Sequence, residues 1–278
     1  MSSDPFESAS ALVQRADSDR YLAGLIAPRD VRAALFALYA FNHEVAKIAE
    51  TVSQPVMGQI RLQWWRDAIG EIYAGTERRH EVVQALAACI RAHALPHALF
   101  EALIDARESD LDEAPFSDWQ SLEAYADATS GNLMRLAARI MGANAGIDEP
   151  ARHAGIAYAL AGLLRAFPFH AAQRRLMLPA EALRAVSLSQ EKIFSGNWDK
   201  KVTALFAMVA TRAREHLQAA RDSRVARAHL PALLLAALVP AYLRRMTRPG
   251  FNPFRDSTDV TVHRRQLAML SALLRGRI

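Results

Sequence analysis

Cysteine is nearly absent from this chain, which has a single one, Cys89, in 278 residues. One cysteine excludes an intrachain disulfide and a zinc site built on cysteines, so the sequence asks for no oxidising compartment. The chain also lacks an apolar run long enough to cross a bilayer. The longest, residues 230–243, falls short of the roughly 20 residues that a span needs and contains two prolines. We expect this segment to be a buried helix.

Several familiar catalytic signatures are missing as well. The sequence contains no glycine-rich phosphate loop, no HExxH zinc motif and no serine nucleophile motif. Alternating runs of β-branched residues, Gly/Ser-rich linkers and internal repeats are also missing. These absences favour one helical domain over residues 1–278, with residues 1–18 as a candidate flexible segment. A functional site in such a domain has to be carried by helices.

Apolar residues recur every three or four positions along most of the chain, which predicts an all-α fold. Between Phe167 and Trp198 this helical pattern lapses. The expected helices cover residues 30–50, 53–73, 80–93, 96–112, 118–141, 150–166, 200–222, 230–246 and 262–274.

Charge and the amino terminus bear on where the protein works. The formal net charge is +5, and most of the excess comes from Arg-rich stretches at 212–227 and 264–277. Such stretches favour acidic partners or anionic lipid headgroups, although ordinary solvated helix faces are the simpler interpretation. The first residues resemble neither a signal peptide nor an Arg-rich transit peptide. We therefore expect a cytoplasmic protein in peripheral contact with the inner face of the cytoplasmic membrane.

Five stretches carry a resemblance to a known family. In chain order they are YLAGLIAPRDVRAALFALYAF, QWWRDAIGEIY, ESDLDE, LEAYADATSGNLMRLAARIMG and GIAYALAGLLRAFPFHAAQRRLMLPAEAL. Together they resemble the squalene/phytoene synthase family, whose members condense two prenyl diphosphates inside an all-α cavity. The resemblance runs over most of the chain and implies a single-domain, isoprenoid-synthase-like helical bundle around a central cavity.

The acidic motifs of that family are the point at which this chain departs from it. Synthases hold magnesium and diphosphate between two acidic clusters on facing helices. Where the first cluster is expected, this chain has Ala46 and Lys47, and only Glu50 keeps a carboxylate. At the second, only Arg165 survives, and Pro168 is expected to bend or end the helix. The resemblance therefore implies no catalytic residues and no cofactor, with magnesium only if catalysis persists.

Three strings are closer to a non-catalytic branch of the family. LYAFNHEVAKIAETVS, MGQIRLQWWRDAIGEIY and LLRAFPFHAAQRRLMLP are similar to the branch that includes a mitochondrial complex I assembly factor. This resemblance implies a bacterial binding or assembly factor in the biogenesis of respiratory complex I (NADH dehydrogenase), with complex I subunits as partners and no nucleic acid.

Two alternatives stay open. The first is a prenyl transferase that condenses two prenyl diphosphates, in which acids outside the usual positions, such as Asp110 and Asp127, would bind the metal. The second is a carrier that holds an isoprenoid or other lipid ligand without reacting it. Fold similarity does not choose between these, because function resides in the site.

Polar side chains from three segments are expected to meet in the cavity, where synthases bind diphosphate. Buried cationic and polar groups have to pair with one another or hold an anion. We expect Glu44 and Glu50 to supply the counter-charges. The five residues expected to converge are His43, Gln63, Arg165, His170 and Arg175. The full set of cavity and ligand-binding candidates is Tyr21, Tyr39, His43, Glu44, Glu50, Gln63, Trp64, Arg165, His170 and Arg175.

Some of these candidates also have structural interpretations. His43 and His170 are expected to be hydrogen-bonded structural groups, with a metal pair across the cavity as the alternative. Arg174 and Arg175 either hold a phosphate or lipid headgroup as a fork or cap a helix end.

Two further positions concern packing. Adjacent helical residues cannot both face the core, so one of Trp64 and Trp65 is expected to be buried and the other to line a groove or an interface. Gly131 lies in a segment where the family packs helices closely, and we expect it to serve packing.

Overall fold

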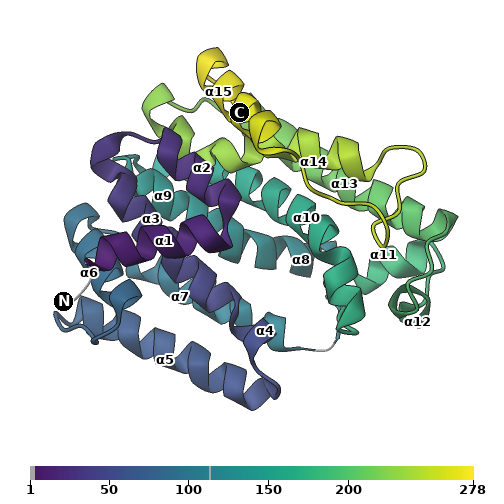
Figure 1. Ribbon diagram of the computed structural model, residues 1–278, viewed down its shortest axis with the longest axis horizontal. Coiled ribbons are helices and arrows are strands. Elements are labelled where there is room, and N and C mark those ends of the chain that lie inside the picture. The colour runs from purple at the N-terminus through teal and green to yellow at the C-terminus, as the bar shows by residue number, and fades with distance from the viewer. Residues whose placement is uncertain (1–3, 113) are drawn as a thin grey trace.

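The structure is a computed structural model that describes residues 4–112 and 114–278 (Figure 1). Within these residues it contains helices and no strand, which confirms the all-α prediction. The α-helices are α1 (Pro5–Ala16), α2 (Ser18–Ile26), α3 (Arg29–Ala46), α4 (Ile48–Thr51), α5 (Pro55–Tyr73), α6 (Glu81–His93), α7 (His97–Ala106), α8 (Trp119–Ala126), α9 (Asn132–Ile140), α10 (Asp148–Ala172), α11 (Ala180–Ala185), α12 (Gln190–Phe194), α13 (Lys200–Asp222), α14 (Val239–Met246) and α15 (Val262–Arg275). Four shorter or irregular turns are η1 (Arg107–Leu111), η2 (Asp127–Gly131), η3 (Ala145–Ile147) and η4 (Arg227–Leu238), of which η2 is π-helical and the others 3₁₀.

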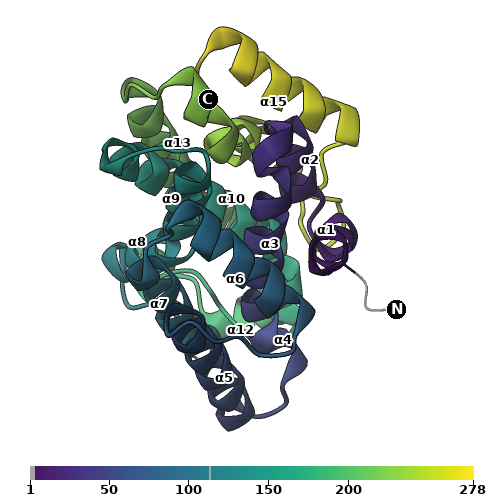
Figure 2. The same cartoon turned by 90° about the vertical axis from the view of Figure 1, so that its left-hand side faces the viewer.

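Helix α10 is the centre of the bundle. Its most extensive contacts are with α13, and it also packs against η2, α9, η4 and α14. In Figures 1 and 2, α15 and α5 lie at opposite ends of the molecule, with α10 and α3 between them. Fully buried apolar side chains of these two central helices, such as Leu38, Phe41, Leu160 and Leu164, form the core.

Two glycines set the closest approach within the bundle. A Cβ atom on Gly155 of α10 would lie 2.4 Å from the backbone N of Gly131 in η2. Backbones this close leave no room for a side chain on Gly155, so the prediction that Gly131 serves packing is confirmed. The predicted helix at 118–141 is interrupted at this contact, where the π-helical turn separates α8 from α9.

Pro168 was expected to bend or end its helix, and the second of these two outcomes is wrong. Helix α10 continues through Pro168 to Ala172, although a proline inside a helix removes one backbone hydrogen bond. The segment is held from outside, because the neighbouring Phe167 is buried and packs edge-on against Phe206 of α13, with ring centroids 5.0 Å apart. Tertiary packing therefore extends the helix six residues beyond the predicted end at residue 166.

Most of the candidate flexible segment at 1–18 is helix α1, while residues 1–3 lie outside the described residues. Asp4 caps α1 by accepting a hydrogen bond from the Phe6 amide at 3.0 Å. Ala9 and Val13 are fully buried, and α1 packs against α3 and α6. This docking of an apolar face orders a segment whose short pattern did not predict a helix.

The apolar segment at 230–243 is buried, as predicted. Its first part is the 3₁₀ stretch η4, which contains Pro231, and its second part belongs to α14. Leu230, Leu233, Leu234 and Leu238 are all inaccessible or nearly so. In the described part of the chain, no helix combines the length and the apolar character needed to cross a bilayer.

Candidate functional site

Asp19 is the centre of a buried polar cluster that joins four helices. This carboxylate on α2 is 3% exposed. It accepts hydrogen bonds from Arg165 on α10 at 3.1 Å and from Arg265 on α15 at 2.6 Å. The hydroxyls of Tyr158 and Tyr242 donate to it at 3.0 Å and 2.7 Å. The guanidinium of Arg165 also lies over the Tyr242 ring, 4.0 Å from its centroid.

Electrostatics keep this aspartate ionised. Burial by itself would raise the pKa of the Asp19 carboxyl, but the nearby Arg165 and Arg265 and the Tyr242 hydroxyl outweigh burial and lower the pKa below its usual value. Arg165, predicted as a ligand-binding residue, therefore has an internal counter-charge. That counter-charge is Asp19, whereas Glu44 and Glu50 were expected to supply it.

A second buried cluster surrounds Asp110 at the end of η1. The Asp110 carboxylate accepts hydrogen bonds from Tyr125 at 2.6 Å and from Arg107 at 3.1 Å. Arg175 donates to the backbone carbonyl of the same residue. His170 lies close by, and burial first, with the charge of Arg175 second, lowers its pKa to about 4. His170 is therefore neutral at pH 7.

Arg174 and Arg175 do not act together as a fork. Arg174 pairs with Glu191 at 2.6 Å on the surface, while Arg175 turns inward to the Asp110 carbonyl. Both line a pocket of about 550 Å³ between η1 and α12. Of the two interpretations of Arg175, the structure favours the cap, on a carbonyl of η1.

A narrow gap lies in the middle of the bundle between α2, α3, α9 and η4. Tyr39 and Arg20 line it together with apolar side chains such as Leu133 and Leu235, and it is too narrow to admit a water molecule. Burial raises the pKa of Tyr39 to about 12. Tyr21 lies at the side of the bundle, stacked on Phe36 with ring centroids 5.4 Å apart. The expected central cavity is thus filled at this point, and a lipid carrier would require the gap to open.

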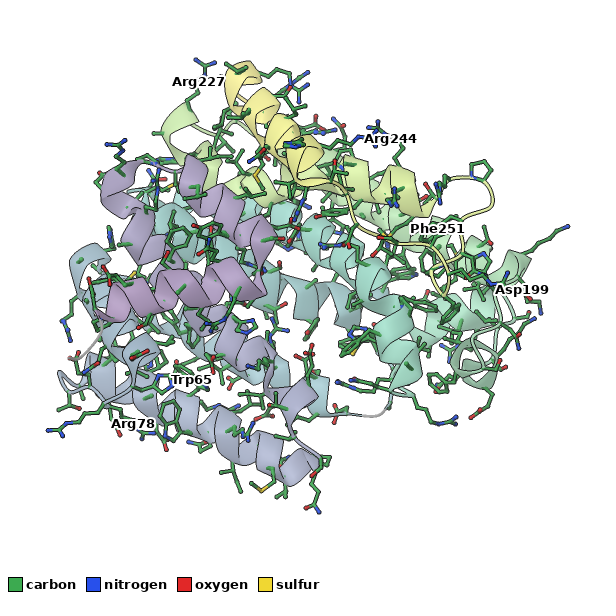
Figure 3. All side chains as sticks on the ribbon, in the orientation of Figure 1. Trp65, Arg78, Asp199, Arg227, Arg244 and Phe251 are labelled. Carbon is green, nitrogen blue, oxygen red and sulfur yellow. The ribbon has the colours of Figure 1, made fainter. Side chains whose placement is uncertain are left out.

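Trp64 lines a separate groove of about 370 Å³. Trp65 beside it is buried against Phe41, while Trp64 is partly exposed and lies under the guanidinium of Arg78, 5.0 Å from its ring. The prediction that one tryptophan is buried and the other lines a groove is confirmed. Figure 3 labels Trp65 and Arg78 in this region above α5. Glu44 also lines this groove.

Gln63 and Glu50 lie on the surface. Gln63 donates to Asp67 at 2.7 Å on the exposed side of α5. Glu50 is exposed within the short helix α4. The prediction that His43, Gln63, Arg165, His170 and Arg175 converge on one cavity is therefore wrong for Gln63. Helix rotation decides which side chains point inward, and Gln63 is on the face of α5 opposite the buried Leu62 and Trp65 row.

The histidines predicted as structural groups, His43 and His170, are partly buried. Burial first, and then the charge of Lys47, lowers the pKa of His43. Within residues 4–112 and 114–278, no group of three or more His, Cys, Asp or Glu side chains is arranged to hold a metal ion. A histidine pair does occur elsewhere, between His153 and His216, whose Nδ1 atoms are 2.9 Å apart.

The acids that an alternative metal site would need already have partners. Asp110 is bound by Tyr125 and Arg107, and Asp127 pairs with Arg135 at 2.7 Å. Removing these cations would be required before a magnesium ion could bind. Asp110 and Asp127, paired in this way, do not fit a magnesium and diphosphate site.

Sequence reasoning missed Asp19 and its partners Tyr158, Tyr242 and Arg265. A signal was available, because a buried arginine needs a carboxylate. Asp19 belongs to the acidic pair just before the first string that resembles the family. Its contacts span up to 246 positions, so no local pattern could pair it with Arg265.

Comparison with known proteins finds a matching family and two kinds of relatives, complex I assembly factors and synthases. The squalene/phytoene synthase family profile matches residues 13–266. The "NADH dehydrogenase (ubiquinone) complex I, assembly factor 6" of Rattus norvegicus is 31% identical over 249 residues, which cover 88% of this chain and 75% of the relative. The presqualene diphosphate synthase of Rhodopseudomonas palustris is 32% identical over 209 residues, 73% of each chain.

A solved structure supports the fold. The crystal structure of a dehydrosqualene synthase in complex with ligand superposes with a TM-score of 0.86 and covers 98% of this chain and 95% of the other. At 16% sequence identity this likeness concerns the fold alone. The predicted isoprenoid-synthase-like bundle is confirmed.

Proposed function

Because this chain belongs to the squalene/phytoene synthase family, we propose that it is a non-catalytic member that acts as a binding or assembly factor in the biogenesis of respiratory complex I. Its partners on this proposal are complex I subunits. The relatives named as complex I assembly factor 6 support the role, with 30–32% identity over 249 residues in the mammalian proteins.

The observation that carries the proposal is that three carboxylates of the bundle are already paired with arginines of the same chain. Catalysis in this family requires acids that are free to bridge magnesium and diphosphate. Here Asp19, Asp110 and Asp127 are each bound by an arginine of the same chain. A metal ion that displaced these arginines would leave buried cations without counter-charges, which is costly. The interior therefore favours internal pairing over metal binding.

A test of catalysis separates the proposal from its main rival. The purified protein is incubated with magnesium and labelled farnesyl or geranylgeranyl diphosphate, and released diphosphate is measured. The presqualene diphosphate synthase of Rhodopseudomonas palustris, run in parallel, is the positive control. We expect no turnover from this chain. Release of many equivalents of diphosphate per protein would overturn the non-catalytic proposal.

The rival is a prenyl transferase, and one observation favours it. The presqualene diphosphate synthase is 32% identical over 73% of this chain, whereas the assembly factor of Rattus norvegicus is 31% identical over 88% of it. The two identities are therefore similar, but the synthase matches less of the chain. A second measurement addresses the assembly role directly. Deleting the gene in its host is expected to reduce assembled NADH dehydrogenase while leaving squalene and carotenoid levels unchanged, and the opposite pattern would support the rival.

The same proposal puts the protein in the cytoplasm, in peripheral contact with the membrane in which the complex is assembled. Assembly of an integral complex brings its factors to the membrane surface. The formal charge of +5 supports attraction to anionic headgroups.

A further inference from the structure

An arginine-lined groove of about 1170 Å³ lies between α14, α15 and the end of α13. These elements lie along the top of Figure 1. The groove brings together the two Arg-rich stretches of the sequence and adds a third set from α14. Among the described residues that line it, Asp259 is the acid. The lining arginines are Arg221, Arg244, Arg245, Arg248, Arg264 and Arg275.

Three of these six arginines bind other groups of the same chain. Arg221 and Arg245 donate to backbone carbonyls at 2.9 Å and 2.7 Å, and Arg248 pairs with Asp256 at 3.3 Å. The other three are exposed and have no hydrogen-bond or ion-pair partner in the described part of the chain. These three, called the free arginines below, are Arg244, Arg264 and Arg275. Figure 3 shows Arg244 on the outer side of α14.

A stripe of exposed leucines runs beside the groove on α15. Leu267, Leu270 and Leu274 are 65%, 46% and 80% exposed. Their spacing of three and four residues places them on one side of the helix. Leu267 also lines the groove, whereas the other two face outward beside it. The cationic groove and the leucine stripe thus form one continuous surface.

We propose that this surface, made of the free arginines and the α15 leucine stripe, docks the protein onto an anionic lipid bilayer. The guanidinium groups bind headgroup phosphates, and the leucines enter the boundary between headgroups and acyl chains, as interfacial amphipathic helices do. The inference rests on the peripheral membrane contact proposed above and names its surface. It does not depend on whether the protein catalyses a reaction.

A bilayer explains both halves of the surface better than an acidic peptide does. A peptide bound in the groove would neutralise the arginines but leave Leu270 and Leu274 in water, because these two side chains do not line the groove. A membrane is wide enough to cover the groove and the stripe together, and it offers negative charge and apolar depth side by side.

Vesicle flotation tests the proposal with the full-length protein. Vesicles of phosphatidylcholine with phosphatidylglycerol are compared with vesicles of phosphatidylcholine alone. The groove variant is Arg244→Gln/Arg264→Gln/Arg275→Gln. Its matched control removes the same charge from exposed sites elsewhere, as Arg79→Gln/Arg184→Gln/Lys200→Gln. A thermal melt confirms that each variant is folded.

The leucines are tested in the same assay. The stripe variant is Leu270→Ser/Leu274→Ser. Its control is Val56→Ser/Ile60→Ser, which changes two comparably exposed apolar residues on α5 at the other end of the molecule.

The expected outcome is binding to anionic vesicles that falls as salt rises from about 0.1 M to about 1 M. At the lower salt the groove variant should bind at least tenfold more weakly, since each basic residue near a bilayer contributes a factor of roughly five. The stripe variant should also lose binding, and both controls should stay within about twofold of the wild type.

Equal losses of vesicle binding in a variant and its control would overturn the assignment of this surface, but the proposal of peripheral membrane contact would still stand. Failure of the wild-type protein to bind anionic vesicles would overturn both, and neither result bears on the test of catalysis.

Discussion

His170 shows how one buried side chain makes stability depend on pH. Its pKa is lowered to about 4 by burial first and by Arg175 second, from an ordinary value of 6.5. Between these two values the unfolded chain takes up a proton that the folded protein does not. The stability that the protein gains from keeping His170 neutral is therefore fully present above pH 6.5 and is lost as the pH falls toward 4. A shift of this size corresponds to roughly 3 kcal/mol.

Replacing this histidine should remove that part of the pH dependence. Between pH 7 and pH 4.5, the free energy of unfolding of His170→Gln is expected to fall less than that of the wild type, by about 2 kcal/mol. Denaturant titration at several pH values measures this difference. The control is His263→Gln, whose exposed ring is in water before and after unfolding. Parallel pH profiles for wild type and His170→Gln would contradict the assignment.

Helix packing at the element scale is set by the contact between α10 and η2. Gly155 and Gly162 both lie on α10, seven residues apart, but only the first touches a neighbouring backbone. A Cβ atom on Gly155 would clash with Gly131, whereas one on Gly162 would meet nothing within 4 Å. The same substitution therefore has opposite effects at two positions of one helix.

This difference gives a paired prediction. Gly155→Ala should destabilise the protein by about 1–3 kcal/mol or more, because the backbones of α10 and η2 have to move apart. Gly162→Ala should stabilise it by roughly 0.5–1 kcal/mol, since alanine restricts the unfolded chain and favours helix. Thermal unfolding of the two variants is the measurement. Equal shifts in Tm would contradict the close approach of α10 and η2.

At the scale of the whole molecule, the Asp19 cluster ties the beginning of the chain to its end. Asp19 on α2 contacts residues of α10, α14 and α15, and it holds α15 through Arg265. The docking surface proposed on α15 therefore depends on a buried carboxylate near the amino terminus.

Removing one arginine from this cluster should weaken the entire fold. Arg165→Ala deletes a counter-charge of Asp19 and is expected to cost about 2–4 kcal/mol, near the lower end for a buried pair because the Arg165 side chain is 27% exposed. The double variant Asp19→Asn/Arg165→Ala should lose less than the sum of the two single variants. Arg184→Ala, at an exposed position, is the control. An unchanged Tm for Arg165→Ala would show that the cluster does not stabilise the protein.

The sequence by itself determined the helical class, because amphipathic periodicity is a local property. Helix α13 has the bounds predicted for it, Lys200–Asp222, and the contrast between Trp64 and Trp65 follows from their adjacent positions on one helix. The resemblance to the family set the expectation of an isoprenoid-synthase-like bundle. These features depend on residues close together in the sequence or on motifs read in order.

Only the tertiary structure decided which polar groups meet. Gln63 was expected inside and lies outside, because the rotation of α5 is fixed by its burial of Leu62 and Trp65 against the core. Arg165 was given the wrong partner, since Asp19 reaches it across 146 positions of sequence. Helix periodicity specifies a buried face but not the helix that covers it. The pairing of charges follows from how the helices cross, and that is decided by the packing of the whole chain.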